Sequence, residues 1–185
     1  KISQSVNTIY KKDNKIIGDN TDIEGFKLGL EKTGQQIKNK KALILGAGGV
    51  VSSIIIALKK MQIKKIYLSN RTELKAIELK KSFSEIELIK WGDTLDFDII
   101  INATSIGLSE KEELNIDYKN ISRNKFFYDV IYNPKETNFL KKAKIFGAQI
   151  ENGKRMFVYQ AQKAFFIWHN ILPVVDEETL NLLDI

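Results

Sequence analysis

The chain has 185 residues, of which 43% are hydrophobic and 28% are charged, a composition typical of a globular protein with a well-formed core. It contains no cysteine, which excludes disulfides, thiolate nucleophiles and cysteine metal ligands, and we expect no metal site. The formal net charge is +6, but 26 of the 29 cations are lysines scattered through the chain, so we expect no nucleic-acid partner. Because no apolar run reaches membrane-spanning length and no signal peptide is recognisable, we expect a cytoplasmic protein without a membrane partner.

The first elements along the chain are a hairpin and a helix. Residues 5–18 predict a β-hairpin that turns at Asp13-Asn14-Lys15, and residues 23–33 predict a helix. Between them lies the polar segment Gly18-Asp19-Asn20-Thr21-Asp22, whose side chains suit a turn or helix cap and equally suit a ligand site. A hairpin alone is marginally stable in water, and the first residue is Lys, so we expect that an N-terminal portion precedes this chain.

From residue 40 onward, short apolar runs alternate with helical ones. The expected strands cover residues 40–46, 64–70, 85–89, 97–104 and 126–132, and the expected helices cover residues 50–61, 72–83 and 136–147. Strands separated regularly by helices predict a parallel, doubly wound α/β sheet. After Gly153 a long helix over residues 155–172 and a short tail helix depart from this repeat, so we expect the C-terminal end to belong to another unit.

The first strand of the repeat ends at Gly46-Ala47-Gly48-Gly49, and a helix follows. Such a turn lets the backbone approach a pyrophosphate at the helix N-terminus, where N–H groups and the helix dipole favour negative charge. Val51 replaces the third glycine of the usual G-x-G-x-x-G pattern, and a tight strand-to-helix turn without a ligand is the alternative. The position of this glycine turn after the first strand of the alternating pattern favours a dinucleotide site.

The end of the second strand indicates which dinucleotide would bind. An NAD site usually has an acidic residue about twenty residues beyond the glycines. Here that place is taken by Asn70-Arg71-Thr72, with Lys75 one turn further on. Arg71 can form two parallel hydrogen bonds to a 2′-phosphate, so we predict NADP, with a solvated arginine beside a helix cap as the alternative. The segment 101–107, "INATSIG", has small and hydroxylated residues that suit close packing against a cofactor ribose.

Seven motifs in this order resemble those of shikimate dehydrogenase, and together they match the C-terminal two-thirds of that family over essentially this whole chain. They are Val6-Asn7-Thr8; Gly18-Asp19-Asn20-Thr21-Asp22 with Gly25; Gly46-Ala47-Gly48-Gly49; Asn70-Arg71-Thr72; Asn102-Ala103-Thr104-Ser105-x-Gly107; Asp129-Val130-Ile131-Tyr132-Asn133-Pro134 with Thr137; and Gly153-x-x-Met156 with Gln160-Ala161. No single motif is unique to the family, but the ordered set is specific.

The resemblance implies an oxidoreductase of aromatic amino acid and chorismate biosynthesis that reversibly reduces 3-dehydroshikimate to shikimate with NADP. It implies a Rossmann-type doubly wound sheet with remnants of a second α/β substrate-binding domain at both chain ends. We expect residues 1–22 to be the end of the substrate domain, residues 23–152 the NADP-binding domain, and residues 153–185 helices that return to the substrate domain. A homodimer is left open.

The resemblance also implies roles for individual residues. Asp22 is the expected catalytic residue, paired with a lysine of the N-terminal domain that we expect upstream of Lys1, so we expect the chain alone to have little activity. The expected substrate contacts are Asn7, Asp22, Tyr132 and Gln160. The expected cofactor contacts are Gly46, Ala47, Gly48, Gly49, Val50, Asn70, Arg71, Thr72, Lys75, Thr104, Ser105, Val130, Gly153 and Met156, the last near the nicotinamide. The single histidine, His169, is expected to be structural.

Three alternatives stay open at this point. A quinate or dual-specificity dehydrogenase would share most of these motifs. Glutamyl-tRNA reductase shares a glycine turn and a similar Asn-Arg-Thr, but the segments "GDNTD" and "DVIYNP" argue against it. A third alternative is an NADP-binding fragment without catalytic activity.

Overall fold

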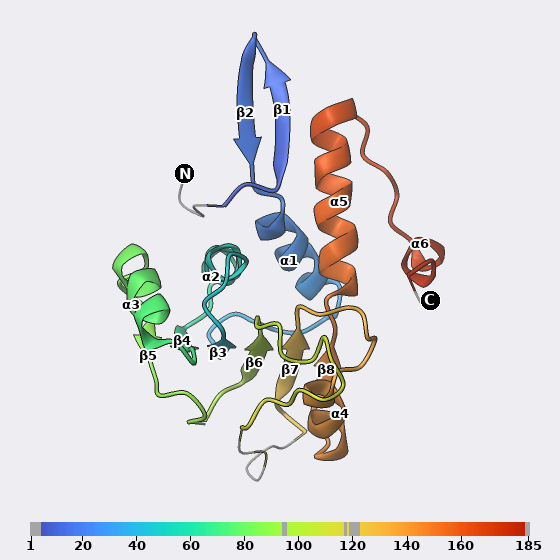
Figure 1. The fold of residues 1–185 in the computed structure, drawn as a ribbon. Coiled ribbons are helices and arrows are strands. Elements are labelled where there is room, and N and C mark those ends of the chain that lie inside the picture. The colour runs from blue at the N-terminus through green and yellow to red at the C-terminus, as the bar shows by residue number, and fades with distance from the viewer. Residues whose placement is uncertain (1–4, 94–95, 117, 119–122, 184–185) are drawn as a thin grey trace.

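A six-stranded parallel sheet forms the centre of the computed structural model, which describes residues 5–93, 96–116, 118 and 123–183. The strands are β3 (Lys41–Leu45), β4 (Lys65–Ser69), β5 (Glu87–Leu88), β6 (Ile99–Asn102), β7 (Phe126–Asp129) and β8 (Gln149–Glu151). Their order across the sheet is β5-β4-β3-β6-β7-β8, and all neighbouring pairs are parallel (Figure 1). The order therefore reverses between β3 and β6, which is the position where doubly wound sheets bind ligands at the carboxyl ends of their strands.

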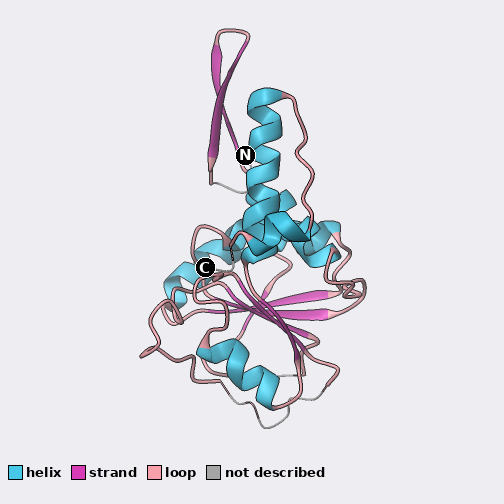
Figure 2. Cartoon of the chain, turned by 90° about the vertical axis from the view of Figure 1, so that its right-hand side faces the viewer, coloured by secondary structure: helices cyan, strands magenta, loops and turns pink. Residues whose placement is uncertain are grey.

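Helices cover both faces of this sheet. They are α1 (Asp22–Glu31), α2 (Val51–Lys60), α3 (Glu73–Ser82), α4 (Asn138–Ile145), α5 (Lys154–His169) and α6 (Glu177–Asn181). Figure 2 shows helices on both faces of the sheet. Along β3, Ala42 and Ile44 pack with residues of α1, α2 and α3, whereas Leu43 and Leu45 pack with residues of α4 on the opposite face. This two-sided burial explains why β3 reads as a continuous apolar run, because successive side chains of a strand point to opposite faces.

The hairpin of β1 (Thr8–Lys12) and β2 (Lys15–Asp19) forms a separate two-stranded antiparallel sheet that rises away from the six-stranded sheet (Figure 1). Asp13 and Asn14 form its turn, both with positive φ, a conformation that these two residue types tolerate better than most. The indole Nε1 of Trp168, near the end of α5, donates to the carbonyl of Ile9 at 3.0 Å. The hairpin thus lies beside the far end of α5.

Helices α1 and α5 pack closely because two glycines of α1 face the backbone of α5. A Cβ atom on Gly25 would lie 2.7 Å from the carbonyl oxygen of Met156, and one on Gly29 would lie 2.9 Å from the nitrogen of Met156. Beyond α5 the chain folds back along this helix, where Gln162 Nε2 donates to the Pro173 carbonyl at 2.6 Å. The hairpin β1–β2, α1 and α5 therefore meet at one side of the sheet.

The predicted fold class is confirmed, with corrections to individual elements. Strand β8 was missed, because a three-residue strand between a helix and a loop leaves no periodicity to detect. Strand β7 ends at Asp129, three residues earlier than predicted, because the Asp129 carboxylate accepts the Ile131 N–H in a turn at 3.0 Å. Helix α5 ends at His169, not at residue 172, because Asn170 adopts the left-handed conformation with φ 53°. The strand predicted over residues 85–89 is reduced to Glu87–Leu88.

The proposed division into three segments remains a prediction, and its outermost residues, 1–4 and 184–185, lie outside the described residues. Among the residues that the structure describes, no helix has both the length and the apolarity needed to span a membrane.

Candidate active site and dinucleotide pocket

A hydrogen-bonded polar cluster joins the segment before β1 to the start of α1. The side-chain amide of Asn7 donates to Asp22 Oδ1 at 2.8 Å, and its carbonyl oxygen accepts the Thr21 N–H at 2.9 Å. Burial is the larger influence on Asp22 and raises the pKa of its carboxyl, while the hydrogen bond from Asn7 acts in the opposite direction. Asp22 is therefore a half-buried carboxyl that one amide holds in place.

Asn20, to which no role was assigned from the sequence, caps α1. Its Oδ1 accepts the backbone N–H groups of Asp22 at 3.1 Å and of Ile23 at 3.3 Å, the first two residues of α1, while Thr21 at the N-cap position makes no side-chain cap. The same oxygen accepts the Ser53 hydroxyl of α2 at 3.1 Å, while its Nδ2 donates to the Ser5 hydroxyl at 2.8 Å. Since Asn20 performs the capping, the Asp22 carboxylate is left for another purpose.

The structure brings three of the four predicted substrate residues together. Thr21 Oγ1 lies 3.1 Å from Asn7 Oδ1 and 3.2 Å from Gln160 Oε1, so it connects Gln160 on α5 to the cluster of Asn7 and Asp22. The fourth, Tyr132, lies apart from this hydrogen-bonded cluster. Tyr132 is 38% exposed, and its ring stacks on that of Phe157 in α5 with centroids 4.7 Å apart.

The predicted dinucleotide turn has the shape that a phosphate needs. Gly46 has φ 110°, and a Cβ atom there would lie 2.7 Å from the Ala103 carbonyl oxygen, so a side chain is excluded. At Gly49, by contrast, a Cβ atom would meet nothing within 4 Å, and no side chain caps the N-terminus of α2 among the described residues. The turn thus leaves space at the positive end of a helix dipole, as an anion requires.

This turn opens into a pocket of about 360 Å³, a volume within the range of small-molecule sites. Nine predicted cofactor residues line it: Gly46, Ala47, Gly48, Asn70, Arg71, Thr72, Lys75, Thr104 and Ser105. Three further lining residues, Trp91, Ala103 and Ile106, were not predicted. Since the pocket lies where the strand order reverses, it has the place, size and cationic wall that suit a dinucleotide with a phosphorylated ribose.

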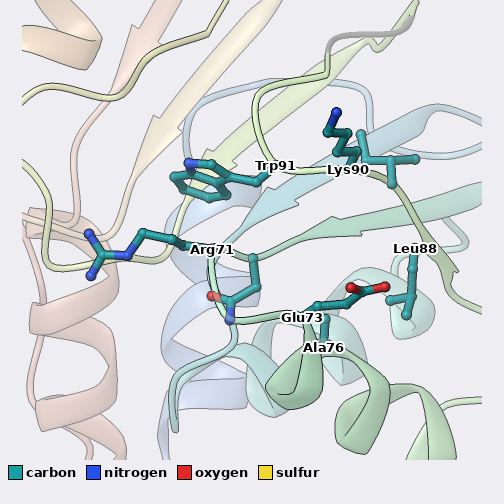
Figure 3. Close-up of a pocket in the computed structure, with 8 residues that line it drawn as sticks. Arg71, Glu73, Ala76, Leu88, Lys90 and Trp91 are labelled. Carbon is teal, nitrogen blue, oxygen red and sulfur yellow. The ribbon is translucent and has the colours of Figure 1, made fainter.

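A second pocket of about 300 Å³ adjoins the first and shares Asn70, Arg71 and Trp91 with it. In Figure 3 the Arg71 guanidinium and the Trp91 indole point in the same direction, away from Leu88, whereas the Glu73 carboxylate points toward Leu88. The cation that we assign to the 2′-phosphate and this indole therefore stand at the boundary between the two pockets.

The remaining predicted cofactor residues lie outside the pocket. Gly49 and Val50 belong to the glycine turn, and Val50 stands at the N-cap position of α2. Val130 and Gly153 touch through their backbones, since a Cβ atom on Gly153 would lie 2.0 Å from the Val130 carbonyl oxygen. Met156 is only 7% exposed and packs in the core beside α1, so little of its surface is available to a nicotinamide.

A fully buried polar network supports the loops at the carboxyl ends of β6 and β7. Asn102 Nδ2 donates to Asp129 Oδ1 at 3.1 Å, and the Thr137 hydroxyl donates to Asp129 Oδ2 at 2.6 Å. Asn102 Oδ1 in turn accepts the hydroxyl of Thr104, a pocket residue, at 2.7 Å. Burial, the largest influence, raises the pKa of the Asp129 carboxyl against these donors. The "NATS" and "DVIYNP" motifs thus contribute positioning residues that the sequence did not identify as such.

His169 lies apart from both sites. It is the exposed last residue of α5, and its ring centroid lies 4.3 Å from that of Phe165.

Comparison with known proteins decides the family. The family model described as shikimate / quinate 5-dehydrogenase matches residues 27–144. A shikimate dehydrogenase (NADP(+)) of Pelagibacter ubique (strain HTCC1062) is 79% identical over 184 residues, which are 100% of this chain and 69% of that protein. The chain belongs to the shikimate / quinate 5-dehydrogenase family.

Solved structures of the shikimate dehydrogenase family have the same fold. The enzyme of Aquifex aeolicus aligns with a TM-score of 0.88 at 34% identity and covers 99% of this chain and 67% of its own. The enzyme of Thermus thermophilus, solved in complex with NADP(H) and shikimate, aligns with a TM-score of 0.86 at 27% identity, over 98% of this chain and 68% of its own. The chain therefore spans about two-thirds of the relatives that it matches, with the family's sheet and helices in place.

Proposed function

We propose that this chain contributes the cofactor site and a catalytic carboxylate to the NADP-dependent, reversible reduction of 3-dehydroshikimate to shikimate. The observation that carries the proposal is the single pocket that combines the glycine turn with Arg71 and Lys75. The 79% identity to a shikimate dehydrogenase (NADP(+)) supports this substrate over quinate, and it supports an oxidoreductase over a binding fragment.

The residues of the pocket fit NADP. The open space at Gly48 and Gly49 admits a pyrophosphate to the N-terminus of α2, and the Cβ-free backbone allows close approach. Arg71 and Lys75, both exposed at the start of α3, are placed to hold the 2′-phosphate that distinguishes NADP from NAD. When bound, the cofactor supplies or accepts the hydride.

Asp22 is the proposed catalytic carboxylate. Asn7 holds its orientation through the 2.8 Å hydrogen bond, while Asn20 takes over the capping of α1, so the carboxylate can face a partner group. In the proposed reaction Asp22 positions and charges the group that moves the substrate hydroxyl proton, which the family resemblance assigns to a lysine upstream of Lys1. Asn7, Tyr132 and Gln160 are the proposed substrate contacts.

The same geometry supports the domain division that we propose. The hairpin β1–β2 and helix α5 lie on one side of the molecule, and the six-stranded sheet lies on the other (Figure 1). We propose that Asp22 and Gln160 line the boundary between the two units. A cytoplasmic location and a homodimer belong to the proposal as well, and cell fractionation and analytical ultracentrifugation test them.

Two measurements test the function. Calorimetric titration of the chain with NADP and with NAD is expected to show tighter binding of NADP. For catalysis, the part of the Pelagibacter ubique relative that this chain does not match can be fused to its N-terminus, and the chimera assayed for NADP-dependent oxidation of shikimate and of quinate beside the unfused chain. A chimera that binds NADP but oxidises neither substrate would contradict the proposed reaction.

A further inference from the structure

Trp91 borders both pockets at the carboxyl edge of the sheet, and the sequence assigned it no role. It follows the short edge strand β5, and part of its side chain packs on the core beneath the sheet while the rest remains accessible. A half-buried indole at the edge of a cationic pocket is anchored on one side and keeps part of its aromatic surface accessible to a ligand.

The backbone around Trp91 is held firmly. The buried hydroxyl of Ser69 donates to the Lys90 carbonyl at 3.1 Å, and the N–H of Ile89 donates to the Leu68 carbonyl at 3.0 Å. On the other side, the Asp93 N–H closes a turn onto the Lys90 carbonyl at 3.1 Å. These hydrogen bonds attach the segment that carries the indole to the end of β4, next to Asn70 and Arg71.

The chemistry of the cofactor determines what would face this indole. On the proposed NADP the 2′-phosphate and the adenine are attached to neighbouring carbons of one ribose. If Arg71 holds the phosphate, the adenine must lie within a few atoms of the guanidinium, against a wall of the same pocket. Trp91 shares both pockets with Arg71, and it is the one aromatic side chain among the residues that line the dinucleotide pocket.

We propose that the Trp91 indole packs against the adenine ring of NADP and is a determinant of cofactor affinity. The inference rests on the proposed function, since it takes NADP as the cofactor. Stacking of a base on an aromatic side chain depends on the face of the ring and not on its hydrogen-bonding edge. Trp91 should therefore strengthen binding of NADP and NAD alike, whereas Arg71 should act on NADP alone.

Intrinsic fluorescence tests the contact without altering Trp91. Trp168 is the only other tryptophan, and its indole binds the hairpin carbonyl of Ile9, so Trp168→Phe leaves Trp91 as the single reporter. Adenosine 2′,5′-bisphosphate is expected to quench the emission of this variant, and nicotinamide mononucleotide is expected to leave it unchanged. Unchanged emission at a bisphosphate concentration that calorimetry shows to be saturating would overturn the proposal.

Substitution of Trp91 measures its contribution. Trp91→Leu keeps apolar bulk but removes the aromatic face, and it is expected to weaken NADP and NAD binding about tenfold each. Trp91→Phe keeps a smaller aromatic face and is expected to restore most of the affinity. Equal affinities of Trp91→Leu and the unsubstituted chain would reject the role of Trp91 while leaving the function intact, whereas failure of the unsubstituted chain to bind NADP would reject the function itself and this inference with it.

Discussion

The side-chain amide of Asn7 donates to the Asp22 carboxylate at 2.8 Å, although the two residues lie on opposite sides of the β1–β2 hairpin in sequence. The carbonyl of the same amide accepts the Thr21 N–H at 2.9 Å, so both ends of the Asn7 amide are used. The contact holds a partly buried carboxyl at the start of α1. The Asp22 carboxyl is therefore held by Asn7 and is not the group that accepts the first N–H groups of α1, which Asn20 accepts.

The stability of the chain should depend on the ionisation of Asp22. Because burial raises its pKa above the usual 3.8, its contribution to stability is full below that value and is lost as pH rises through the folded-state pKa. Asp22→Asn keeps the acceptor for Asn7 but does not titrate. Urea unfolding from about pH 4 to about pH 7 should therefore show the variant gaining stability relative to the unsubstituted chain as pH rises. If the variant instead loses stability relative to the unsubstituted chain as pH rises, the predicted direction of the pKa shift is wrong.

The same substitution should remove activity in the chimera that carries the N-terminal part of the Pelagibacter ubique relative. General acid–base groups typically contribute about 10²- to 10⁴-fold in rate, so we expect Asp22→Asn to lower the turnover number by about two orders of magnitude or more. NADP affinity should hardly change, since Asp22 does not line the dinucleotide pocket. A stable variant with near-normal turnover would reduce the segment "GDNTD" to a well-capped turn.

Arg71→Ala should weaken NADP binding about tenfold or more and leave NAD binding nearly unchanged, because a hydrogen bond to a charged group contributes about 1.5 to 3 kcal/mol. Calorimetric titrations of both cofactors measure this difference directly. Arg123→Ala is the matched control, because Arg123 lies beside Gly147 and not in the pocket. Equal losses for NADP and NAD would refute the assignment of Arg71 to the 2′-phosphate.

Two glycines of the dinucleotide turn should respond differently to alanine. Gly46→Ala places a Cβ atom 2.7 Å from the Ala103 carbonyl oxygen, and it puts alanine at a residue whose φ is 110°. We expect this substitution to lower the free energy of unfolding by about 1 to 3 kcal/mol. Gly49→Ala meets nothing within 4 Å and should leave the melting temperature unchanged while reducing NADP affinity, because the new methyl group enters the space proposed for the phosphates. Thermal melts and titrations of both variants separate the structural role from the binding role.

Thr137→Val should destabilise the fold by about 1 to 3 kcal/mol, because it leaves the buried carboxyl of Asp129 without the hydroxyl that now donates at 2.6 Å. The substitution also removes the acceptor that caps α4 at the Leu140 N–H. Thr137→Ser keeps the hydroxyl and serves as the control, with a smaller loss expected in urea unfolding. A loss as large for Ser as for Val would show that the methyl group, not the hydrogen bond, is what matters there.

The sequence by itself determined the doubly wound sheet, the glycine turn and the cationic residues after the second strand. Each of these signals is local: apolar runs such as 40–46 have the length of buried strands, and Gly46 and Arg71 follow closely on the strands that carry them. Parallel strands bring their carboxyl ends to one edge, so residues that follow different strands can be expected to share one pocket. The strand that was missed, β8, is three residues long and contains a single apolar residue, so it forms no apolar run.

Only the tertiary structure decided which polar side chains actually meet. Gln160 reaches Thr21 across 139 positions of sequence, and Asn102 reaches Asp129 across 27, through packing that no periodicity encodes. The sequence also could not separate the roles of Asn20 and Asp22, since both residue types cap helices equally well. In the structure, the Asn20 side chain turns to the N–H groups of α1, and the Asp22 carboxylate turns to the Asn7 amide. Trp91 stayed unnoticed for the same physical reason: its place beside Arg71 depends on how the loop after β5 is fastened to the end of β4, which is a long-range contact.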